Sequence, residues 1–320
     1  MFRSFFIYIS KAAWARKIVT SWSIAWKAAS RFVAGETLED ALQTTRSLNQ
    51  KGMAVTLDHL GEHTTNPDEA RQAARHILDI LEKIEETGVR ANVSLKLTQI
   101  GLALSYDICR ENLAVILERA RQCQTFVRLD MEDSPWVEQT LQIYRELVSQ
   151  YGAETVGVVI QSYLYRSEDD IRALAAYGAR VRLCKGAYKE PPEVAYPKKR
   201  DVDANFDRLA EMLVDYAGDA GTPGVSPDGK TPPIPAIASH DDLRIQHVKE
   251  YIRGKGFPRQ AVEFQMLNGI RRDLQEQLAG EGFPVRIYVP YGTEWYPYFM
   301  RRLAERPANL WFFISNYFRR

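Results

Sequence analysis

The sequence predicts an α/β protein of the (β/α)8, TIM-like barrel class, in distorted form, with N-terminal helices packed outside the barrel. Two observations support this prediction. Eight short hydrophobic runs alternate with helical patterns, and almost every run ends on a polar or ionisable residue. A doubly wound sheet is the competing architecture. It is disfavoured because the runs number eight and no glycine-rich dinucleotide fingerprint follows the first of them.

Each expected strand is short, rich in Val, Ile, Leu or Phe, and bounded by turn residues. A parallel barrel builds its active site from the C-terminal ends of its strands, so the residues there are candidate site residues. The strands are expected at Met53–Asp58, Asn92–Leu97, Phe126–Asp130, Val156–Gln161, Arg180–Cys184, Pro235–Ser239, Val262–Gln265 and Val285–Val289. The residues near their ends are Asp58 with His59, Lys96, Asp130, Gln161, Arg182 with Lys185, Ser239 with His240, Gln265 and Tyr288.

Helical patterns fill the intervals between the strands. The segment Pro67–Thr87 has a proline in its first turn and stops before Gly88, as helices commonly start and end. Another helix is expected from Ser134 to Tyr151. The same signals predict helices at Asp201–Tyr216, Asp241–Arg253 and Asn268–Ala279.

The N-terminal segment is basic and aromatic, with no acidic residue before Glu36. The favoured interpretation is a helical arm, residues 1–50, that packs over a catalytic barrel formed by residues 51–320 and including a C-terminal helix. The alternative is a basic helix that lies on an anionic membrane, which would place the protein on the inner face of the cell membrane. A signal peptide is disfavoured because Lys11 interrupts the short apolar run.

Composition indicates a globular protein of the cytoplasm. Hydrophobic residues make up 45% of the 320 residues and charged residues 26%, which is ordinary for a chain with a sizeable core. The net charge of +1 gives no general attraction to nucleic acid. Cys109, Cys123 and Cys184 are odd in number and form no metal-spaced pair, which favours a reducing compartment. No run approaches the roughly 18 apolar residues of a membrane span.

The segment Gly218–Pro235 is rich in glycine and proline and is expected to form a long exposed loop. Within it, Gly224–Thr231 matches the phosphate-binding pattern G-x-x-x-x-G-K-[ST]. That pattern binds phosphate only when a strand precedes it and a helix follows it. Pro232 and Pro233 come directly afterwards and oppose a helix, so nucleotide binding at this segment is rejected.

A basic motif follows the fifth expected strand. Arg182 and Lys185 are three residues apart, and Gly186 comes next, where the backbone permits a ligand to approach closely. This arrangement suits an anionic or electron-rich cofactor. The alternative is a basic loop on the rim of the barrel.

A second cluster lies on a helix after the last strand. Tyr298 and Arg302 are four residues apart and share a helix face, as do Arg301 and Glu305. Arginine suits a carboxylate because its guanidinium binds both oxygens. The alternative for Arg301 is a solvated ion pair with Glu305.

A metal site is not expected. Asp58, His59, His63 and His240 are the candidate ligands. His59 and His63 would share a face only if the turn after the first strand were helical, and Gly61 opposes this.

From about Met53 to its C-terminus the chain resembles the monofunctional bacterial proline dehydrogenases. Eight segments carry the resemblance in order: VSLKLTQIG, VRLDMED, VVIQSYLYR, RLCKGAYKEP, ASHD, EFQMLNGIR, RIYVPYG and YPYFMRRLAER. The resemblance implies a distorted (β/α)8 barrel that binds FAD without covalent attachment. It also implies oxidation of L-proline to Δ1-pyrroline-5-carboxylate, by hydride transfer from C5 of proline to N5 of FAD, and passage of the electrons to a membrane quinone.

The resemblance implies roles for individual residues, with Asp130 and Arg182 as catalytic groups. The residues expected to bind proline are Lys96, Tyr188, Leu267, Tyr288, Tyr298, Arg301 and Arg302. Those expected to hold FAD are Met131, Gln161, Arg182, Lys185, Gly186, Ala187, Ser239 and His240. A pyrroline-5-carboxylate dehydrogenase is a candidate partner, because it would consume the product.

Two other functions stay open at this point. A barrel lyase or isomerase would use Lys96 or Lys185 to form a Schiff base and would bind no flavin. A non-catalytic barrel would bind proline without reducing a dye.

Overall fold

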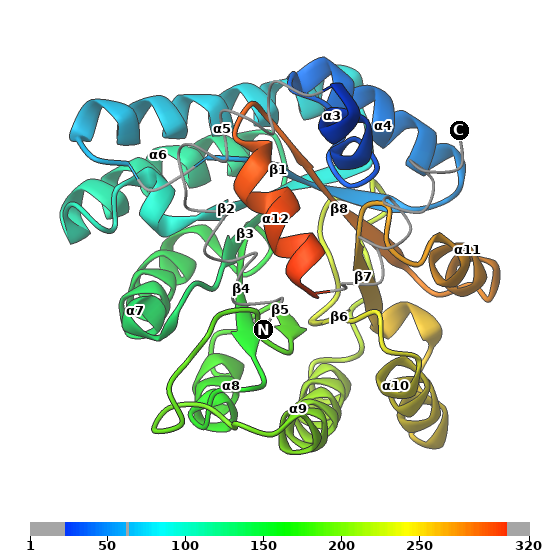
Figure 1. The fold of residues 1–320 in the computed structure, drawn as a ribbon. Coiled ribbons are helices and arrows are strands. Elements are labelled where there is room, and N and C mark those ends of the chain that lie inside the picture. Colours follow the sequence, from blue (N-terminus) through cyan, green and yellow to red (C-terminus); the bar gives the residue numbers. More distant parts are fainter. Residues whose placement is uncertain (1–22, 62–63, 306–320) are drawn as a thin grey trace.

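The computed structural model describes residues 23–61 and 64–305. Eight parallel strands form a closed barrel in which each strand pairs with the next, and the last pairs with the first (Figure 1). The predicted barrel is therefore confirmed. The strands are β1 (Ala54–His59), β2 (Ala91–Lys96), β3 (Val127–Asp130), β4 (Val156–Gln161), β5 (Val181–Cys184), β6 (Pro235–Ala238), β7 (Glu263–Leu267) and β8 (Val285–Tyr291).

The strand bounds differ from the predicted ones by at most two residues. The strands are buried on both faces, because helices cover the outside and side chains fill the inside. Polar side chains share the interior: Thr56 and Asn92 lie side by side on β1 and β2, and Thr56 Oγ1 donates to Asn92 Oδ1 at 2.6 Å. The barrel interior is thus partly polar and hydrogen-bonded.

Helices after the strands form the outer ring, and α5 (Pro67–Thr87) has the predicted bounds. Asn66 caps its first turn by accepting from the amide of Glu69 at 3.0 Å, and Gly88 ends it with a φ of 63°. The other ring helices after strands are α6 (Tyr106–Gln122), α7 (Ser134–Tyr151), α8 (Ser167–Ala175), α9 (Lys199–Asp219), α10 (Asp242–Gly254) and α11 (Arg272–Gly280), and two short 3-10 turns are η1 (Leu97–Ile100) and η2 (Arg259–Ala261).

The helix expected at Asn268–Ala279 begins later than predicted, at Arg272. Gly269 and Arg271 both have left-handed backbones, with φ values of 76° and 53°, so the chain turns before α11 begins. A side chain at Gly269 would clash with the carbonyl oxygen of Arg31. Glycine is therefore required at this turn.

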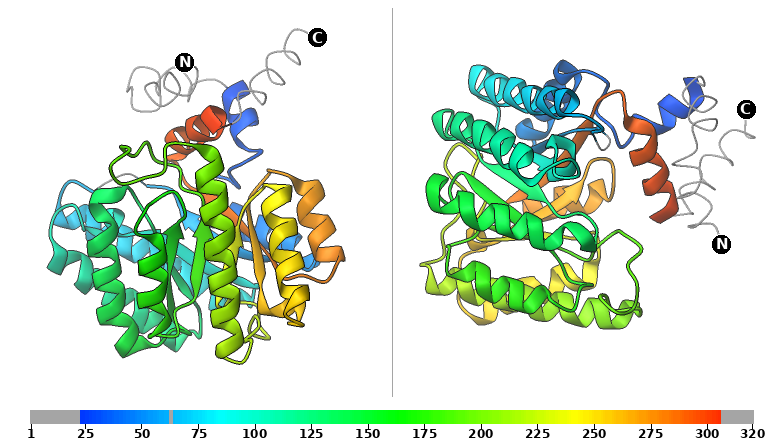
Figure 2. Two further views of the ribbon diagram at one scale, coloured as in Figure 1. Left: turned by 90° about the horizontal axis from the view of Figure 1, so that it is seen from below. Right: turned by 90° about the vertical axis from the view of Figure 1, so that its left-hand side faces the viewer.

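One helix leaves the ring, which makes the barrel distorted. The last described helix, α12 (Trp295–Glu305), lies across the C-terminal end of the barrel beside α3 (Ser23–Ala29) (Figures 1 and 2). The place beside β8 and β1 is taken instead by α4 (Leu38–Gln50), which packs on both strands.

An apolar group, here called the mouth cluster, joins α12 to the N-terminal segment. The rings of Trp26 and Trp295 lie 5.3 Å apart, and Trp295 Nε1 donates to Glu36 Oε1 at 3.2 Å. The buried members are Ala29, Phe32, Val33, Leu60, Ile270, Trp295, Tyr296, Tyr298, Phe299, Met300 and Leu303. The described part of the arm thus packs on the barrel, as the favoured interpretation expected.

Residues 1–22 and the tail after Glu305 lie outside the described residues, and the domain boundary at residue 50 stays a prediction. Within the described chain, no helix combines the length and apolar character that crossing a membrane requires.

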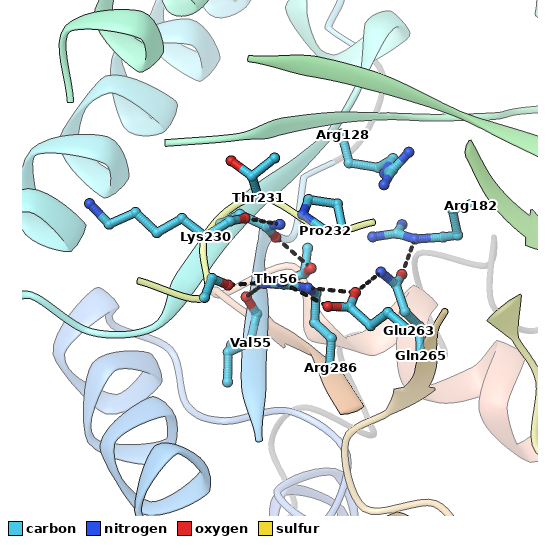
Figure 3. A network of polar contacts seen from close by, with 12 residues as sticks. Val55, Thr56, Arg128, Arg182, Lys230, Thr231, Pro232, Glu263, Gln265 and Arg286 are labelled. Atoms are coloured by element: carbon cyan, nitrogen blue, oxygen red, sulfur yellow. Dashed lines mark hydrogen bonds and ion pairs between the residues drawn. The ribbon is translucent and has the colours of Figure 1, made fainter. Parts of the chain in front are cut away.

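The expectation of an exposed loop at Gly218–Pro235 is wrong for its second half. Gly229 and residues 231–235 are buried, and we call residues 229–235 the plug segment. It closes the N-terminal end of the barrel, where polar side chains from three places donate to its carbonyl groups. These bonds run from Arg286 Nη2 to Gly229 at 2.8 Å, from Asn92 Nδ2 to Lys230 at 2.9 Å, and from Arg180 Nη1 to Pro232. Figure 3 labels Lys230, Thr231 and Pro232 of this segment together with Arg286, one of the three donors.

The phosphate-loop pattern at Gly224–Thr231 lies in this irregular segment. No helix begins at Lys230 or Thr231, and the chain runs directly into β6 at Pro235. The segment therefore lacks the helix that the phosphate-binding pattern requires.

Candidate active site

A buried ionic network occupies the C-terminal end of the barrel. Arg182 Nη1 donates to Asp130 Oδ1 at 2.7 Å, and Ser94 Oγ donates to the same oxygen at 2.6 Å. The phenol of Tyr288 donates to Asp130 Oδ2 at 2.7 Å. The donors come from β5, β2 and β8, so closure of the barrel itself brings them to Asp130 on β3.

Further contacts fix the guanidinium of Arg182. Its Nε donates to Gln265 Oε1 at 2.6 Å, and Nη1 also reaches Ser94 Oγ at 3.2 Å. The guanidinium carbon lies 5.3 Å from the centre of the Tyr288 ring, within the range of a cation–π contact. Arg182 is therefore held in one orientation by groups from several strands.

Lys96 ends β2 beside this network, with Nζ 3.6 Å from Asp58 Oδ1. Burial opposes the charged form of Lys96, but the carboxylates of Asp58 and Asp130 outweigh it and raise its pKa. Burial, followed by the charge of Asp130, raises the pKa of Tyr288 well above its ordinary value. At neutral pH Lys96 is thus a cation and Tyr288 a neutral donor.

Tyr188 follows β5, and 37% of its surface is exposed. Burial raises the pKa of its phenol to about 12, against the opposing charges of Lys96 and Arg301. Since both cations act on this phenol, the structure brings Tyr188 near each of them. Arg301 itself is exposed on α12.

The other expected substrate residues gather at the mouth cluster. Leu267 ends β7 and packs against the cluster, of which Tyr298 is a buried member. The guanidinium carbon of Arg302 lies 5.1 Å from the centre of the Tyr298 ring. The expected proline residues thus form a polar group at the strand ends and a basic, aromatic group on α12.

Among the expected cofactor residues, Gln161 at the end of β4 is buried. Its Nε2 donates to the carbonyl oxygen of Met131 at 3.3 Å, while its Oε1 has no hydrogen-bond partner among the described residues. Buried polar atoms in proteins are almost always paired. Gln161 Oε1 is therefore a candidate acceptor for a ligand N–H or O–H.

The segment after β5 carries a cation and a glycine. Lys185 Nζ lies 2.5 Å from Asp203 Oδ1 and 2.7 Å from Asp241 Oδ2. Gly186 has a φ of 106°, and a side chain there would clash with the ring of Tyr163. The glycine is thus required by the fold itself, and Ala187 beside it is exposed.

Ser239 and His240 follow β6. Ser239 Oγ accepts from the amide of Asp241 at 3.1 Å, and His240 Nε2 accepts from the amide of Leu267 at 3.0 Å. Because Nε2 accepts, a neutral His240 carries its proton on Nδ1. The backbone of Leu267, an expected substrate residue, thereby orients His240, an expected cofactor residue.

Sequence reasoning missed Ser94 and the function of Gln265. Ser94 bridges Asp130 and Arg182, and Gln265 accepts from Arg182. The signal that could have found them is the two-residue spacing of polar residues in each strand. Ser94 precedes Lys96 by two residues, and Glu263 precedes Gln265 by two. Residues two apart on a strand face the same side, so these pairs indicate a polar barrel interior.

No group of three His, Cys, Asp or Glu side chains within the described ranges is placed to hold a metal ion, and His63 lies outside them. Cys109, Cys123 and Cys184 are free cysteines.

A closed parallel barrel with a buried ionic network at its C-terminal end defines the class of TIM-barrel enzymes. The chain belongs to the proline dehydrogenase family, whose profile matches residues 41–314. It is 40% identical over 318 residues to proline dehydrogenase 1 of Bacillus subtilis (strain 168), with 98% of each chain covered. It is 41% identical over 293 residues to proline dehydrogenase of Deinococcus radiodurans, with 91% and 90% covered. The resemblance found in the sequence is confirmed.

The fold is also similar to solved structures of longer proteins. The crystal structure of proline utilization A (PutA) from Bdellovibrio bacteriovorus, inactivated by N-propargylglycine, matches with a TM-score of 0.79 and 25% identity. The match covers 88% of this chain and 33% of that one, so this chain spans about a third of the length of that protein.

Proposed function

We propose that this protein oxidises L-proline to Δ1-pyrroline-5-carboxylate with FAD as cofactor and passes the electrons to a membrane quinone. Membership in the proline dehydrogenase family supports proline oxidation, the first step of proline catabolism. The observation that carries the proposal is the network around Asp130, where Arg182, Ser94 and Tyr288 converge at the barrel mouth. A pyrroline-5-carboxylate dehydrogenase is the proposed partner that consumes the product.

The residues at the ends of β3 to β6 fit FAD. Gln161 offers a buried acceptor without a described partner, and Lys185 offers a cation for an anionic phosphate. When bound, FAD supplies at N5 the acceptor for the hydride that leaves C5 of proline. The proposed FAD residues are Met131, Gln161, Arg182, Lys185, Gly186, Ala187, Ser239 and His240.

We assign the proline carboxylate to Arg301 and Arg302 on α12. A guanidinium binds both oxygens of a carboxylate, and two adjacent arginines near the barrel mouth offer two such groups. The charges of Arg301 and Lys96 both act on the phenol of Tyr188, which supports a role for Tyr188 in the same substrate site. Leu267, Tyr288 and Tyr298 supply the remaining surface for the ring and backbone of proline.

The charges at the strand ends suit removal of a hydride from an amine. The departing hydride leaves positive charge on the C–N unit, which the carboxylates of Asp58 and Asp130 stabilise. Arg182 stabilises the negative charge that reduction gives to the cofactor. The amine must be neutral before the hydride leaves, and the cation of Lys96 opposes a second positive charge nearby.

The Schiff-base alternative is disfavoured by the state of both lysines. A nucleophilic lysine needs a neutral amine, which a depressed pKa supplies. The pKa of Lys96 is raised by Asp58 and Asp130, and Lys185 is paired with two carboxylates.

The proposal is tested by incubating the FAD-loaded protein with L-proline and a quinone analogue. We expect quinone reduction that depends on L-proline and a product lighter than proline by two hydrogens, detected by mass spectrometry. D-proline is the matched control, because its carboxylate points away from a site built for the L isomer. Absence of turnover with L-proline in protein that retains FAD would refute the substrate assignment.

A further inference from the structure

A row of hydrogen-bonded side chains runs from Arg182 through the barrel interior to its N-terminal end (Figure 3). Arg182 Nε donates to Gln265 Oε1 at 2.6 Å, and Gln265 Nε2 donates to Glu263 Oε1 at 2.6 Å. Glu263 then pairs with Arg286 through two bonds of 2.8 and 3.0 Å. We call Arg182, Gln265, Glu263 and Arg286 the buried relay, since each exposes no more than 6% of the surface of the whole residue.

The two neighbours of Gln265 allow its amide only one orientation. Arginine can only donate hydrogen bonds, and an ionised carboxylate can only accept them. Gln265 Oε1 must therefore face Arg182, and Gln265 Nε2 must face Glu263. A flipped amide would leave two buried groups unpaired, which is costly in a dry interior.

The far end of the relay is anchored to the backbone. Arg286 donates from Nη1 to the carbonyl oxygen of Val55 at 3.0 Å and from Nη2 to that of Gly229 at 2.8 Å. Gly229 belongs to the plug segment, so the relay spans the barrel from its N-terminal closure to the site of Arg182. Glu263 is thereby fixed on the side away from Gln265.

At the near end, the relay determines which nitrogen of Arg182 stays available. Gln265 occupies Nε, while Asp130 and Ser94 occupy Nη1. No hydrogen bond from Nη2 to a described residue is seen. This nitrogen is the one that a ligand at the barrel mouth can use.

We propose that Gln265 and Glu263 are positioning residues that hold the guanidinium of Arg182 toward the cofactor and so help to set the cofactor's reduction potential. The proposal rests on the proposed function, in which Arg182 stabilises the reduced cofactor. A fixed cation beside the ring favours the negative charge gained on reduction, because its interaction is strong in a buried site.

The test compares two substitutions at Gln265 with a control inside the same barrel. Gln265→Met removes both hydrogen bonds with little change in shape. Gln265→Glu keeps an acceptor for Arg182 but places a second carboxyl group beside Glu263. The control is Asn92→Leu, which also removes a buried amide with two hydrogen bonds, to Thr56 and Lys230, neither of which is a member of the relay.

The readouts are the flavin midpoint potential, obtained by reductive titration, together with kcat and KM for proline. For Gln265→Met we expect kcat to fall by about 10- to 100-fold, a common effect of losing a group that orients a site residue, with KM changed by about twofold or less. The midpoint potential should also shift. Asn92→Leu should keep the wild-type potential even if its thermal stability falls.

Gln265→Glu gives a second, independent signature. Two adjacent carboxyl groups cannot both ionise easily. The carboxyl group introduced by Gln265→Glu should therefore share one proton with Glu263, and the pair should lose that proton with a raised pKa. The midpoint potential should then gain a new pH-dependent step absent from wild type, and fall below the wild-type value once that proton leaves.

Wild-type potentials and kcat values in both flavin-loaded Gln265 variants would overturn the proposal, as would an equal shift in Asn92→Leu. If Gln265→Met loses its flavin, the test rests on Gln265→Glu, which keeps the acceptor for Arg182. A wild-type protein that binds FAD but does not react with proline would refute the proposed function alone, because the potentials are measured without proline.

Discussion

Arg182 on β5 and Asp130 on β3 face each other at the barrel mouth, with 2.7 Å between Nη1 and Oδ1 and side chains only 8% and 14% exposed. The two strands are not neighbours, since β4 lies between them in the sheet. The curvature of the closed barrel brings side chains on its inner face closer together than a flat sheet would. The pair therefore belongs to the fold as much as to the site.

Replacing Asp130 tests this dual contribution. Asp130→Asn keeps the size of the side chain but leaves the buried guanidinium of Arg182 without its counter-charge. Breaking a buried ion pair on one side costs about 3–5 kcal/mol. We expect a loss of that order in the free energy of unfolding, measured by urea titration, and a fall in kcat/KM of at least about 30-fold. Wild-type stability and turnover together would contradict this view of the pair.

The hydroxyl of Tyr288 should account for only part of the contribution of this side chain to turnover. Tyr288→Phe removes the 2.7 Å bond to Asp130 but keeps the ring beside Arg182. A hydrogen bond to a charged group is worth about 1.5–3 kcal/mol, so kcat/KM should fall by about 10- to 150-fold. Tyr288→Leu, which also removes the ring, should lose more. Equal losses in the two variants would show that the hydroxyl carries the whole effect.

The buried pair of Glu263 and Arg286 should behave differently when one or both members are replaced. Glu263→Leu alone leaves the guanidinium of Arg286 buried without a counter-charge and should lower the free energy of unfolding by about 3–5 kcal/mol. The double variant Glu263→Leu with Arg286→Met should recover much of that loss. Urea unfolding of both variants measures the difference. The exposed pair of Arg46 and Glu39 is the control, and its removal should cost no more than about 1 kcal/mol.

The sequence predicted the barrel well because strands and helices are indicated by local patterns of apolar residues and by the residues at their ends. The strand Val156–Gln161 and the helix Pro67–Thr87 were predicted with their observed bounds. The plug segment was missed because its burial depends on Asn92, Arg180 and Arg286, which come from distant parts of the chain. Glycine and proline content indicates a loop and gives no information about its depth.

The candidate site was predicted only in part, for a related reason. A polar residue at a strand end is visible in the sequence, as Asp130 and Tyr288 show. The hydrogen-bond partner of each such residue depends on the register and closure of all eight strands. Ser94 and Glu263 therefore became visible as members of the network only once the strands were in place.

The arginines of α12 should control the affinity for proline. Each charged hydrogen bond to the substrate carboxylate is worth about 1.5–3 kcal/mol, so Arg301→Ala and Arg302→Ala should each lower kcat/KM by about 10- to 150-fold, largely through KM. Steady-state kinetics with L-proline measures this. Arg172→Ala, which removes an exposed ion pair with Glu168 on α8, is the matched control and should be silent. Unchanged kcat/KM in both α12 variants would refute the carboxylate assignment.

Lys96 should link stability to alkaline pH. Its pKa is raised in the folded state, so the folded protein holds this proton more tightly than the unfolded chain does. The stabilising contribution is fully present below the unfolded pKa of about 10.4 and is lost as the pH rises through the folded pKa. The difference in the free energy of unfolding between wild type and Lys96→Met, measured by urea titration, should therefore be constant near pH 8 and decrease above about pH 10.4. Lys51→Met, at an exposed pair with Glu276, should show no such difference.

The most direct test of the account is the visible absorption spectrum of the purified protein, recorded anaerobically before and after addition of L-proline. We predict a bound-flavin spectrum that bleaches with L-proline, which would establish cofactor, substrate and hydride transfer in one experiment. A colourless protein that takes up no added FAD would contradict the account, and so would a bound flavin that L-proline leaves oxidised.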